Sequence, residues 1–313
     1  MDAVATPEHD ELYRLDKRTH ELLIASAPLM AQWAESECKP KVVGGMEEWA
    51  KKHKHEEVHT DEGCGWYHST WQYLRLLNMV AVPPWYKFYN RALSGILRKK
   101  PNARVLISAC ADWGMLATLH EAIETAGAKP HVMIYDICRT PLLACQWYAE
   151  RHGLDIDCVC DNILTSPKMP LHSFDLIVTD EFLTVLKAEY KPQILTRWNE
   201  LLAPGGSVVT TAMLGGPTNQ ALRDNYAARA RQRLGEHAED FRQMAADPAD
   251  IVSRFERFAQ LHNRHMLKDE AEIRTLFSDF YLGFMSLTPT PGECVNPTDS
   301  FQIVAAVPHT GRP

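Results

Sequence analysis

The sequence predicts an α/β protein with a doubly wound, mostly parallel sheet, late antiparallel strands, a helical N-terminal cap and a helical insertion. Between residues 104 and 213, strand-like apolar runs such as RVLISA and FDLIVTD alternate with amphipathic, helix-like runs such as MLATLHEAIETAG. This alternation is typical of βαβ units, which place helices on both faces of a parallel sheet. The 313 residues, 45 % of them hydrophobic, suffice for one large domain with appendages or for two small domains.

Helices are expected before this core. The runs LYRLDKRTHELLIASAPLMAQWA and STWQYLRLLNMVAV have apolar residues at helical spacing, and KKHKHEEVHTDEG between them is a charged run without periodicity. That run is interpreted as a solvated loop, with a metal-binding histidine tract as the alternative. We therefore expect a helical cap region over residues 1–100 and a Rossmann-like domain over residues 101–313.

The core elements follow in order. HVMIYD, DIDCVC, FDLIVTD and SVVTTAM are the expected strands after RVLISA, and helices end at Gly127, at Gly153 and at the Pro-Gly-Gly of residues 204–206, the last of them starting near Glu181. The helical insertion is expected at about 219–278. FYLGFMSLTP and SFQIVAAVP then complete the sheet as an antiparallel pair. We expect the cap and the insertion to form one cover over the carboxyl edge of the sheet.

Charge and composition exclude several classes of protein. With 33 basic and 40 acidic residues, the formal net charge is −7, which disfavours nucleic acid as a partner. The sequence has no run of about 18 apolar residues and begins with a polar, acidic segment, so neither a membrane partner nor a secretory signal is expected. The interpretation is a cytoplasmic protein with a small-molecule substrate, a homodimer being one possible assembly.

The eight cysteines are interpreted as reduced, mostly buried thiols, and no metal is expected. Cys158 and Cys160 form a CxC pattern whose side chains share one face of a strand. A metal site there is the less favoured alternative, because no second cysteine pair or HxxxH pattern has ligand spacing.

Polar residues follow the expected strands at their carboxyl ends, where open α/β sheets bind ligands. Asp136 closes the second strand, and an acidic residue there can accept hydrogen bonds from both ribose hydroxyls of a nucleoside. Asp161 and Asn162 follow the third strand and suit the edge of an adenine ring. Thr179 and Asp180 follow the fourth.

These residues, together with FDLIVTD and LLAPGGSVVTT, resemble class I S-adenosylmethionine-dependent methyltransferases, whose L-x-P-G-G turn precedes strand five. In that family the first loop reads acidic-x-Gly-x-Gly-x-Gly, and here only its last glycine, Gly114, is kept. The resemblance implies a methyltransferase with S-adenosyl-L-methionine as cofactor. The cofactor-binding residues it implies are Ser108, Cys110, Asp112, Gly114, Asp136, Ile137, Asp161, Asn162, Thr179 and Asp180.

Asp112 replaces a glycine of the family's loop and has two interpretations. Its carboxylate could pair with the ammonium group of the cofactor, or it could cap the helix that follows. A dinucleotide is disfavoured in either case, because an aspartate would repel its phosphates where a bare glycine turn and a helix N-terminus are preferred.

The segment GWYHSTWQYLR at residues 65–75 is the expected acceptor site, with His68 as the candidate base and Tyr67 beside it. Trp71 and Arg75, and Tyr226 in the insertion, are the candidate substrate-binding residues, with simple packing of Trp71 as the alternative. The expected acceptor is a small polar metabolite, amino-acid-like and methylated at S or N; methionine S-methylation would need no base. The alternatives are O-methylation with His68 as base and a non-catalytic, cofactor-binding regulatory protein.

Overall fold

The computed structural model describes residues 15–38, 54, 63–80, 87–216, 218–289 and 298–309. Its centre is a seven-stranded sheet in the order β3-β2-β1-β4-β5-β7-β6. The strands from β3 to β5 are parallel, and β7 is antiparallel to both β5 and β6. The strands are β1 (Arg104–Ser108), β2 (His131–Asp136), β3 (Ile156–Cys160), β4 (Phe174–Val178), β5 (Leu202–Leu214), β6 (Tyr281–Pro289) and β7 (Asp299–Ala306).

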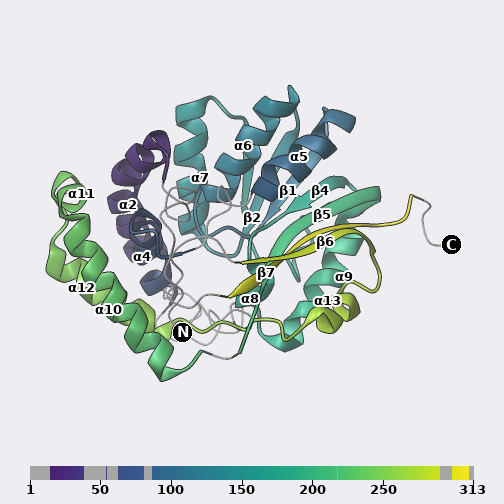
Figure 1. Ribbon diagram of the computed structural model, residues 1–313. Coiled ribbons are helices and arrows are strands. Elements are labelled where there is room, and N and C mark those ends of the chain that lie inside the picture. Colours follow the sequence, from purple (N-terminus) through teal and green to yellow (C-terminus); the bar gives the residue numbers. More distant parts are fainter. Residues whose placement is uncertain are drawn as a thin grey trace.

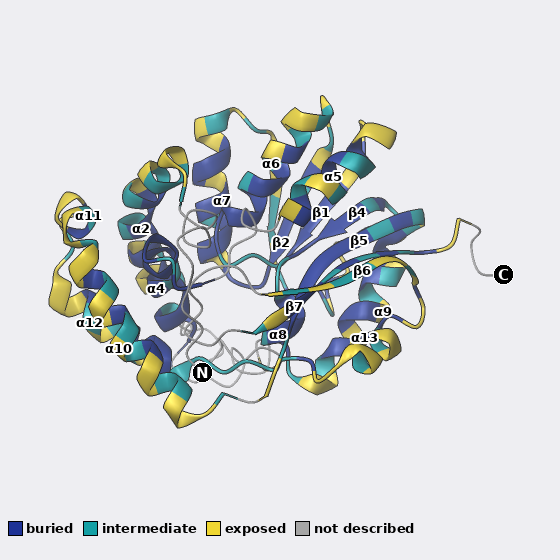
Figure 2. Ribbon diagram, in the orientation of Figure 1, coloured by how far each residue is buried: buried dark blue, intermediate teal, exposed yellow. Residues whose placement is uncertain are grey.

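This sheet confirms the predicted fold class, because the order β3-β2-β1-β4-β5 is that of a doubly wound, Rossmann-like sheet with its switch point between β1 and β4. Successive residues of β1 and β4 belong to two different apolar clusters: Val105 and Leu176 to one, Leu106 and Ile177 to the other. Both faces of the central strands are therefore buried, as Figure 2 shows.

Helices cover the two faces of the sheet (Figure 1). On one face α5 packs against α6, and α7 packs against β2 and β3. On the other face α8 and α9 pack against β5, and α13 packs against α9. Their bounds are α5 (Lys87–Lys99), α6 (Gly114–Ala126), α7 (Arg139–His152), α8 (Phe182–Val185), α9 (Lys191–Leu201) and α13 (Glu270–Leu276).

The helix expected from Glu181 to Pro204 is broken. After α8, Leu186 has extended backbone, with φ −79° and ψ 134°, and a short 3-10 turn (Ala188–Tyr190) precedes α9. Pro192 lies at the first turn of α9, where its missing N–H and fixed φ are tolerated. Strand β5 begins directly after α9 and includes the Pro-Gly-Gly sequence.

A separate group of helices forms the cap: α2 (Lys17–Glu37), α4 (Gly65–Leu76), α10 (Gln220–Glu236), α11 (Ala238–Gln243) and α12 (Pro248–Leu261). In this group α2 packs against α4, and α12 packs against both α4 and α10, so the N-terminal helices and the insertion meet as expected. Two helices expected in the cap lie elsewhere. Helix α5 covers the sheet because its apolar residues Phe88, Leu93 and Leu97 are buried there, and α13 lies beside α9.

The charged run at residues 51–63 lies outside the described residues, except for Lys54 and Gly63. Among the helices that the structure describes, none is long and apolar enough to cross a membrane.

The Pro-Gly-Gly sequence generates a prediction about stability. A Cβ on Gly206 would lie 2.9 Å from the carbonyl oxygens of Ala203 and Phe174, which belong to the backbone and cannot move away cheaply. We therefore expect Gly206→Ala to destabilise the protein by about 1–3 kcal/mol, measured by urea unfolding. Gly95→Ala is the matched control, because a Cβ there meets nothing within 4 Å and alanine favours α5 by about 0.5–1 kcal/mol. Equal effects of the two changes would contradict this account.

Candidate active site

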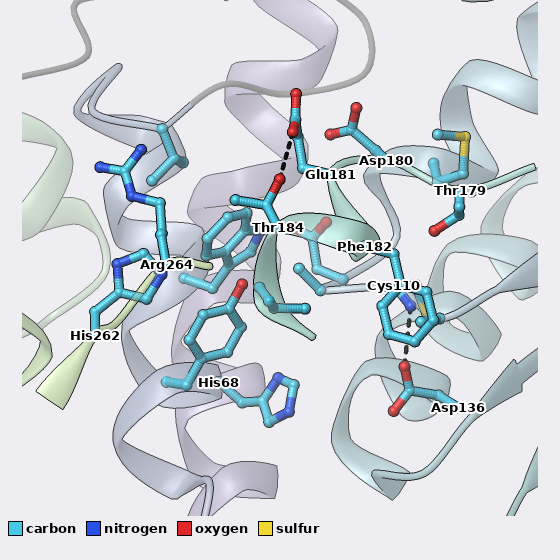
Figure 3. A pocket seen from close by; sticks show the side chains of 18 of the residues that line it. His68, Cys110, Asp136, Thr179, Asp180, Glu181, Phe182, Thr184, His262 and Arg264 are labelled. Carbon is cyan, nitrogen blue, oxygen red and sulfur yellow. Dashed lines mark hydrogen bonds between the residues drawn. The ribbon is translucent and has the colours of Figure 1, made fainter. Parts of the chain in front are cut away.

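A large pocket lies between the carboxyl ends of β1, β2 and β4 and the cap. It encloses about 1190 Å³ of space, part of it open to solvent. Figure 3 shows Asp180 and Glu181 at one end of the pocket, with His68 and Asp136 on opposite sides of the other end.

Asp136 lies where the sequence predicts a ribose-binding carboxylate. Its Oδ2 accepts a hydrogen bond of 2.9 Å from the backbone N–H of Cys110, and its Oδ1 accepts one of 2.7 Å from the N–H of Cys138. The loops after β1 and β2 thus hold the carboxylate in place, and it lines the pocket.

In the loop after β1, residues other than glycine occupy most of the positions where the resemblance led us to expect glycine. Ala109 adopts a left-handed backbone with φ 67°, a conformation that costs a non-glycine residue free energy. Asp112 accepts a 2.8 Å hydrogen bond from the N–H of Gly114 at the start of α6. Its other oxygen pairs with Arg75, whose guanidinium carbon lies 4.2 Å from the centre of the Trp113 ring.

Asp112 accepts the N–H of the first residue of α6, although the N-cap residue of that helix is Trp113, and it forms an ion pair that no sequence pattern indicated. Arg75 is fully buried and does not line the pocket, whereas Asp112 does. Arg75 was predicted to bind a substrate, but in the structure it lies behind Asp112 and outside the pocket lining. Pairing of Asp112 with the cofactor ammonium stays a prediction.

The cap contributes an aromatic wall. Helix α4 begins at Gly65, so Tyr67, His68 and Trp71 all project from it into the pocket. Tyr67 stacks on Trp71 with ring centroids 5.1 Å apart and on Phe258 of α12 at 5.6 Å. Tyr226 of α10 also stacks on Phe258, at 5.7 Å, and lines the pocket. The structure thus brings four of the predicted acceptor-site residues to one cavity.

Two adjacent carboxylates form the opposite wall. The Oδ1 of Asp180 accepts hydrogen bonds from the hydroxyls of Tyr89 at 2.9 Å and Thr211 at 2.7 Å. Glu181 accepts hydrogen bonds of 2.9 Å from the hydroxyls of Thr184 and Ser300. Burial, together with the neighbouring Glu181 carboxylate, raises the pKa of Asp180 to about 7, and burial also raises the pKa of Glu181. One proton is therefore readily held at this pair near neutral pH.

His262 and Arg264, after the end of α12, also line the pocket, and neither was predicted from the sequence. Burial, together with the positive charges of Arg264 and Arg223, lowers the pKa of His262 well below its usual range, so its imidazole is neutral at pH 7. No local pattern marks this histidine among the 14 in the chain. Its place depends on long-range packing, shown by the His262 ring centroid 6.0 Å from that of Tyr67.

Of the ten predicted cofactor residues, those lining the pocket are Cys110, Asp112, Asp136, Thr179 and Asp180. The other five residues lie outside the pocket lining. Ser108 is fully buried and accepts a hydrogen bond from Trp198, and Gly114 and Ile137 are buried outside the pocket lining. Asp161 accepts hydrogen bonds from the backbone N–H of Asn162 and the hydroxyl of Ser166. Neither Asp161 nor Asn162 lines the pocket.

Solved structures similar to the chain include many S-adenosylmethionine-dependent methyltransferases. One from Methanosarcina mazei is 17 % identical, with 67 % of this chain and 95 % of that chain covered and a TM-score of 0.46. A 1,6-didemethyltoxoflavin-N1-methyltransferase from Burkholderia thailandensis, solved with S-adenosylhomocysteine, is 14 % identical over 87 % and 94 %, with a TM-score of 0.49. Magnesium protoporphyrin IX methyltransferase from Synechocystis is 13 % identical over 70 % and 83 %, with a TM-score of 0.43.

No protein-family model matches the chain, and a search of curated proteins finds no relative. At identities of 17 % and below, the likeness to solved structures concerns the fold and leaves the acceptor open.

The Asp180–Glu181 pair generates a pH-dependent prediction. Because the pKa of Asp180 is about 7 in the folded protein and near 3.8 in the unfolded chain, the folded state binds more protons between these values, and stability falls as the pH rises through this window. Asp180→Asn keeps an oxygen that accepts from Tyr89 and Thr211 but removes the charge. We expect it to raise Tm by about 2–4 °C at pH 8 and by much less at pH 4 to 5, measured by scanning calorimetry.

Asp240→Asn is a control of opposite sign. Burial of Asp240 is outweighed by hydrogen bonds from His237 and His20, which hold the pKa of this carboxyl below its usual value, so the variant should lose stability. An increase in Tm for Asp180→Asn that is the same at all pH values would contradict the raised pKa of Asp180.

Proposed function

We propose that the protein is an S-adenosylmethionine-dependent methyltransferase whose acceptor is a small polar amine. One observation carries the proposal: the carboxylate of Asp136, held by the loops after β1 and β2, lines the same pocket as the Asp180–Glu181 pair and the aromatic wall of α4. A nucleoside-binding carboxylate and a second polar site thus share one cavity.

The residues at the β1 and β2 side fit the cofactor. Asp136 would hold the ribose hydroxyls, and the buried hydroxyl of Thr179 has no partner among the described residues. Arg75 has two buried donors, Nε and Nη2, without a described partner, beside the pocket-lining carboxylate of Asp112. This arrangement suits an amino-acid end, with Asp112 toward the ammonium group and Arg75 holding the Asp112 carboxylate from behind. The cofactor, when bound, supplies an electrophilic methyl group.

The opposite side of the pocket favours an amine as acceptor. Asp180 and Glu181 can hold a cation, and the faces of Tyr67 and Trp71 attract one by cation–π interaction. A protonated amine must lose a proton before its nitrogen can attack the methyl group, and a carboxylate oxygen of Asp180 can take that proton, because a base is most effective when its pKa lies near the working pH. We therefore propose that Asp180, predicted from the sequence to bind the cofactor, binds the acceptor instead.

Two other acceptors remain as alternatives. A thioether such as methionine needs no base and would use the aromatic wall alone. A hydroxyl acceptor needs a base, and either His68 or the neutral imidazole of His262 could serve. A non-catalytic, cofactor-binding protein would have no use for the acceptor side, which disfavours that interpretation. We propose a small-molecule acceptor and a cytoplasmic location, with the net charge of −7 disfavouring nucleic acid.

The first test concerns the cofactor. Asp136→Asn should weaken binding of S-adenosylhomocysteine by about 1.5–3 kcal/mol, or roughly 10- to 150-fold, because hydrogen bonds to a charged acceptor are lost. Isothermal titration measures this. Asp175→Asn is the matched control: Asp175 also accepts a backbone N–H, from Arg104 at 2.8 Å, but lies at the opposite edge of the sheet. Unchanged affinity in Asp136→Asn, or equal losses in both variants, would refute the ribose-binding role.

The second test concerns the base, once an acceptor is found by screening amines for S-adenosylhomocysteine release. We expect the rate to rise with pH through about 7, since Asp180 must be deprotonated to accept the proton. Asp180→Asn should lower turnover by roughly 100- to 10,000-fold and abolish this acidic limb. His68→Ala should keep the limb. A limb that survives in Asp180→Asn and vanishes in His68→Ala would instead make His68 the base.

A further inference from the structure

A cluster of thiols and one imidazole lies beside the pocket, between the cap and the sheet. The ligand atoms of Cys38, Cys64 and His68 all lie within 4.8 Å of one another, and the three residues are buried. The sulfur of Cys138 lies 3.3 Å from that of Cys64 and is also buried. Among the described residues, Cys38, Cys64 and His68 form the one group of this kind that is close enough to hold a metal ion.

Sequence spacing did not indicate this group, because its members come from three separate places in the fold. Cys38 follows the last turn of α2, Cys64 and His68 lie at the start of α4, and Cys138 immediately precedes α7. Packing of α2 against both α4 and α7 brings these three ends together.

The geometry and the donor types suit zinc. Zinc binds thiolates at about 2.3 Å and imidazole nitrogen at about 2.0–2.1 Å, so donors of a tetrahedral site lie about 3.5–3.8 Å apart. The ligand atoms of Cys38, Cys64 and His68 lie within 4.8 Å of one another, so side-chain shifts of about 1 Å would bring these three to binding distance of one ion. Cys138 lies outside that group but 3.3 Å from Cys64, and its side chain would have to turn toward the ion to supply the fourth ligand. Soft sulfur ligands with one imidazole favour zinc over calcium or magnesium, which require oxygen.

We propose that Cys38, Cys64, Cys138 and His68 bind one zinc ion. Each thiol binds as a thiolate and releases its proton to solvent, and His68 binds as the neutral imidazole. With three thiolates and Zn²⁺, the site carries one net negative charge, and four protein ligands make it a closed, structural site.

A second group of cysteines, Cys110, Cys145 and Cys158, differs from the proposed zinc site and favours protonated thiols. The sulfur atoms of Cys110 and Cys145 are 3.9 Å apart, and Cys158 lies in the same apolar cluster. The contact with Cys145, together with burial, raises the pKa of the Cys110 thiol well above its usual value, so this cluster favours protonated thiols. It supplies a matched control for substitutions.

The zinc site would connect the cap to the cofactor side of the pocket. The backbone N–H of Cys138 donates to Oδ1 of Asp136, so the ligand loop and the ribose-binding carboxylate form one unit. A metal-bound imidazole cannot accept a proton, which agrees with Asp180 rather than His68 as the base. The site itself does not depend on the proposed methyl transfer.

The test uses the full chain purified under reducing conditions without a metal-affinity step. We expect one zinc per chain by elemental analysis. After removal by chelator, Co²⁺ should give thiolate-to-metal charge-transfer bands and tetrahedral d–d bands, and Zn²⁺ should displace it. Cys38→Ser and Cys64→Ser should each weaken Co²⁺ binding by roughly 100-fold or more, whereas Cys158→Ser should bind as the unchanged protein does.

Three results would overturn the zinc site. The first is that the unchanged protein, with its thiols shown by titration to be reduced, gives no Co²⁺ spectrum. The second is that Cys64→Ser and Cys158→Ser lose Co²⁺ affinity equally. The third is that a Cys64–Cys138 disulfide forms in place of metal binding. Circular dichroism identifies a variant that fails to fold, and Cys138→Ser or His68→Gln then replaces it. Titration of the same samples with S-adenosylhomocysteine keeps a failure of the metal site distinguishable from a failure of the proposed function.

Discussion

The buried ion pair of Arg75 and Asp112 is the interaction on which the relation between cap and sheet depends. Arg75 comes from α4, Asp112 from the loop after β1, and the two side chains are 0 % and 4 % exposed. Separating them would leave a buried charge without a partner, at a cost of about 3–5 kcal/mol. The cap and the cofactor loop are therefore held in one geometry, with Asp112 at the pocket and Arg75 behind it.

A series of contacts connects this ion pair to α2 and α4 of the cap and to the loop after β1 of the sheet. Trp113 lies under the Arg75 guanidinium and donates a 3.1 Å hydrogen bond from its indole to the hydroxyl of Ser26 in α2. Ser26 in turn donates to Gln72 of α4 at 2.6 Å. The first loop of the sheet, α2 and α4 are thus connected through buried polar groups, and such networks fix orientation more strictly than apolar packing alone. The walls of the pocket are correspondingly preorganised.

The sequence predicted what local patterns determine. The βαβ alternation gave the sheet, and the position of Asp136 at the end of a strand placed it at the ligand-binding edge, since strand ends meet there whatever the details of packing. The amphipathic pattern of α5 shows that it has an apolar face but not which surface covers that face, and so α5 was assigned to the cap. His262, the Arg75–Asp112 pair and the Cys38–Cys64–Cys138 cluster depend on contacts between distant segments, which no spacing in the sequence reports. The break after α8 was missed because Leu186 is a good helix former that takes extended backbone here.

The altered loop after β1 now has a physical explanation. Of the glycine positions in the methyltransferase loop pattern that the sequence resembles, only Gly114 holds glycine, and a Cβ there would lie 3.0 Å from Oδ1 of Asp112 and 3.3 Å from Nη1 of Arg75. The ion pair occupies the space next to the backbone, so a side chain at this position would press against the pair. Ala109 supplies the sharp turn at φ 67°, and the N–H of Cys110 is aimed at Asp136. The loop after β1 therefore holds a buried charged pair beside its backbone, with glycine at the position where a side chain would press against that pair.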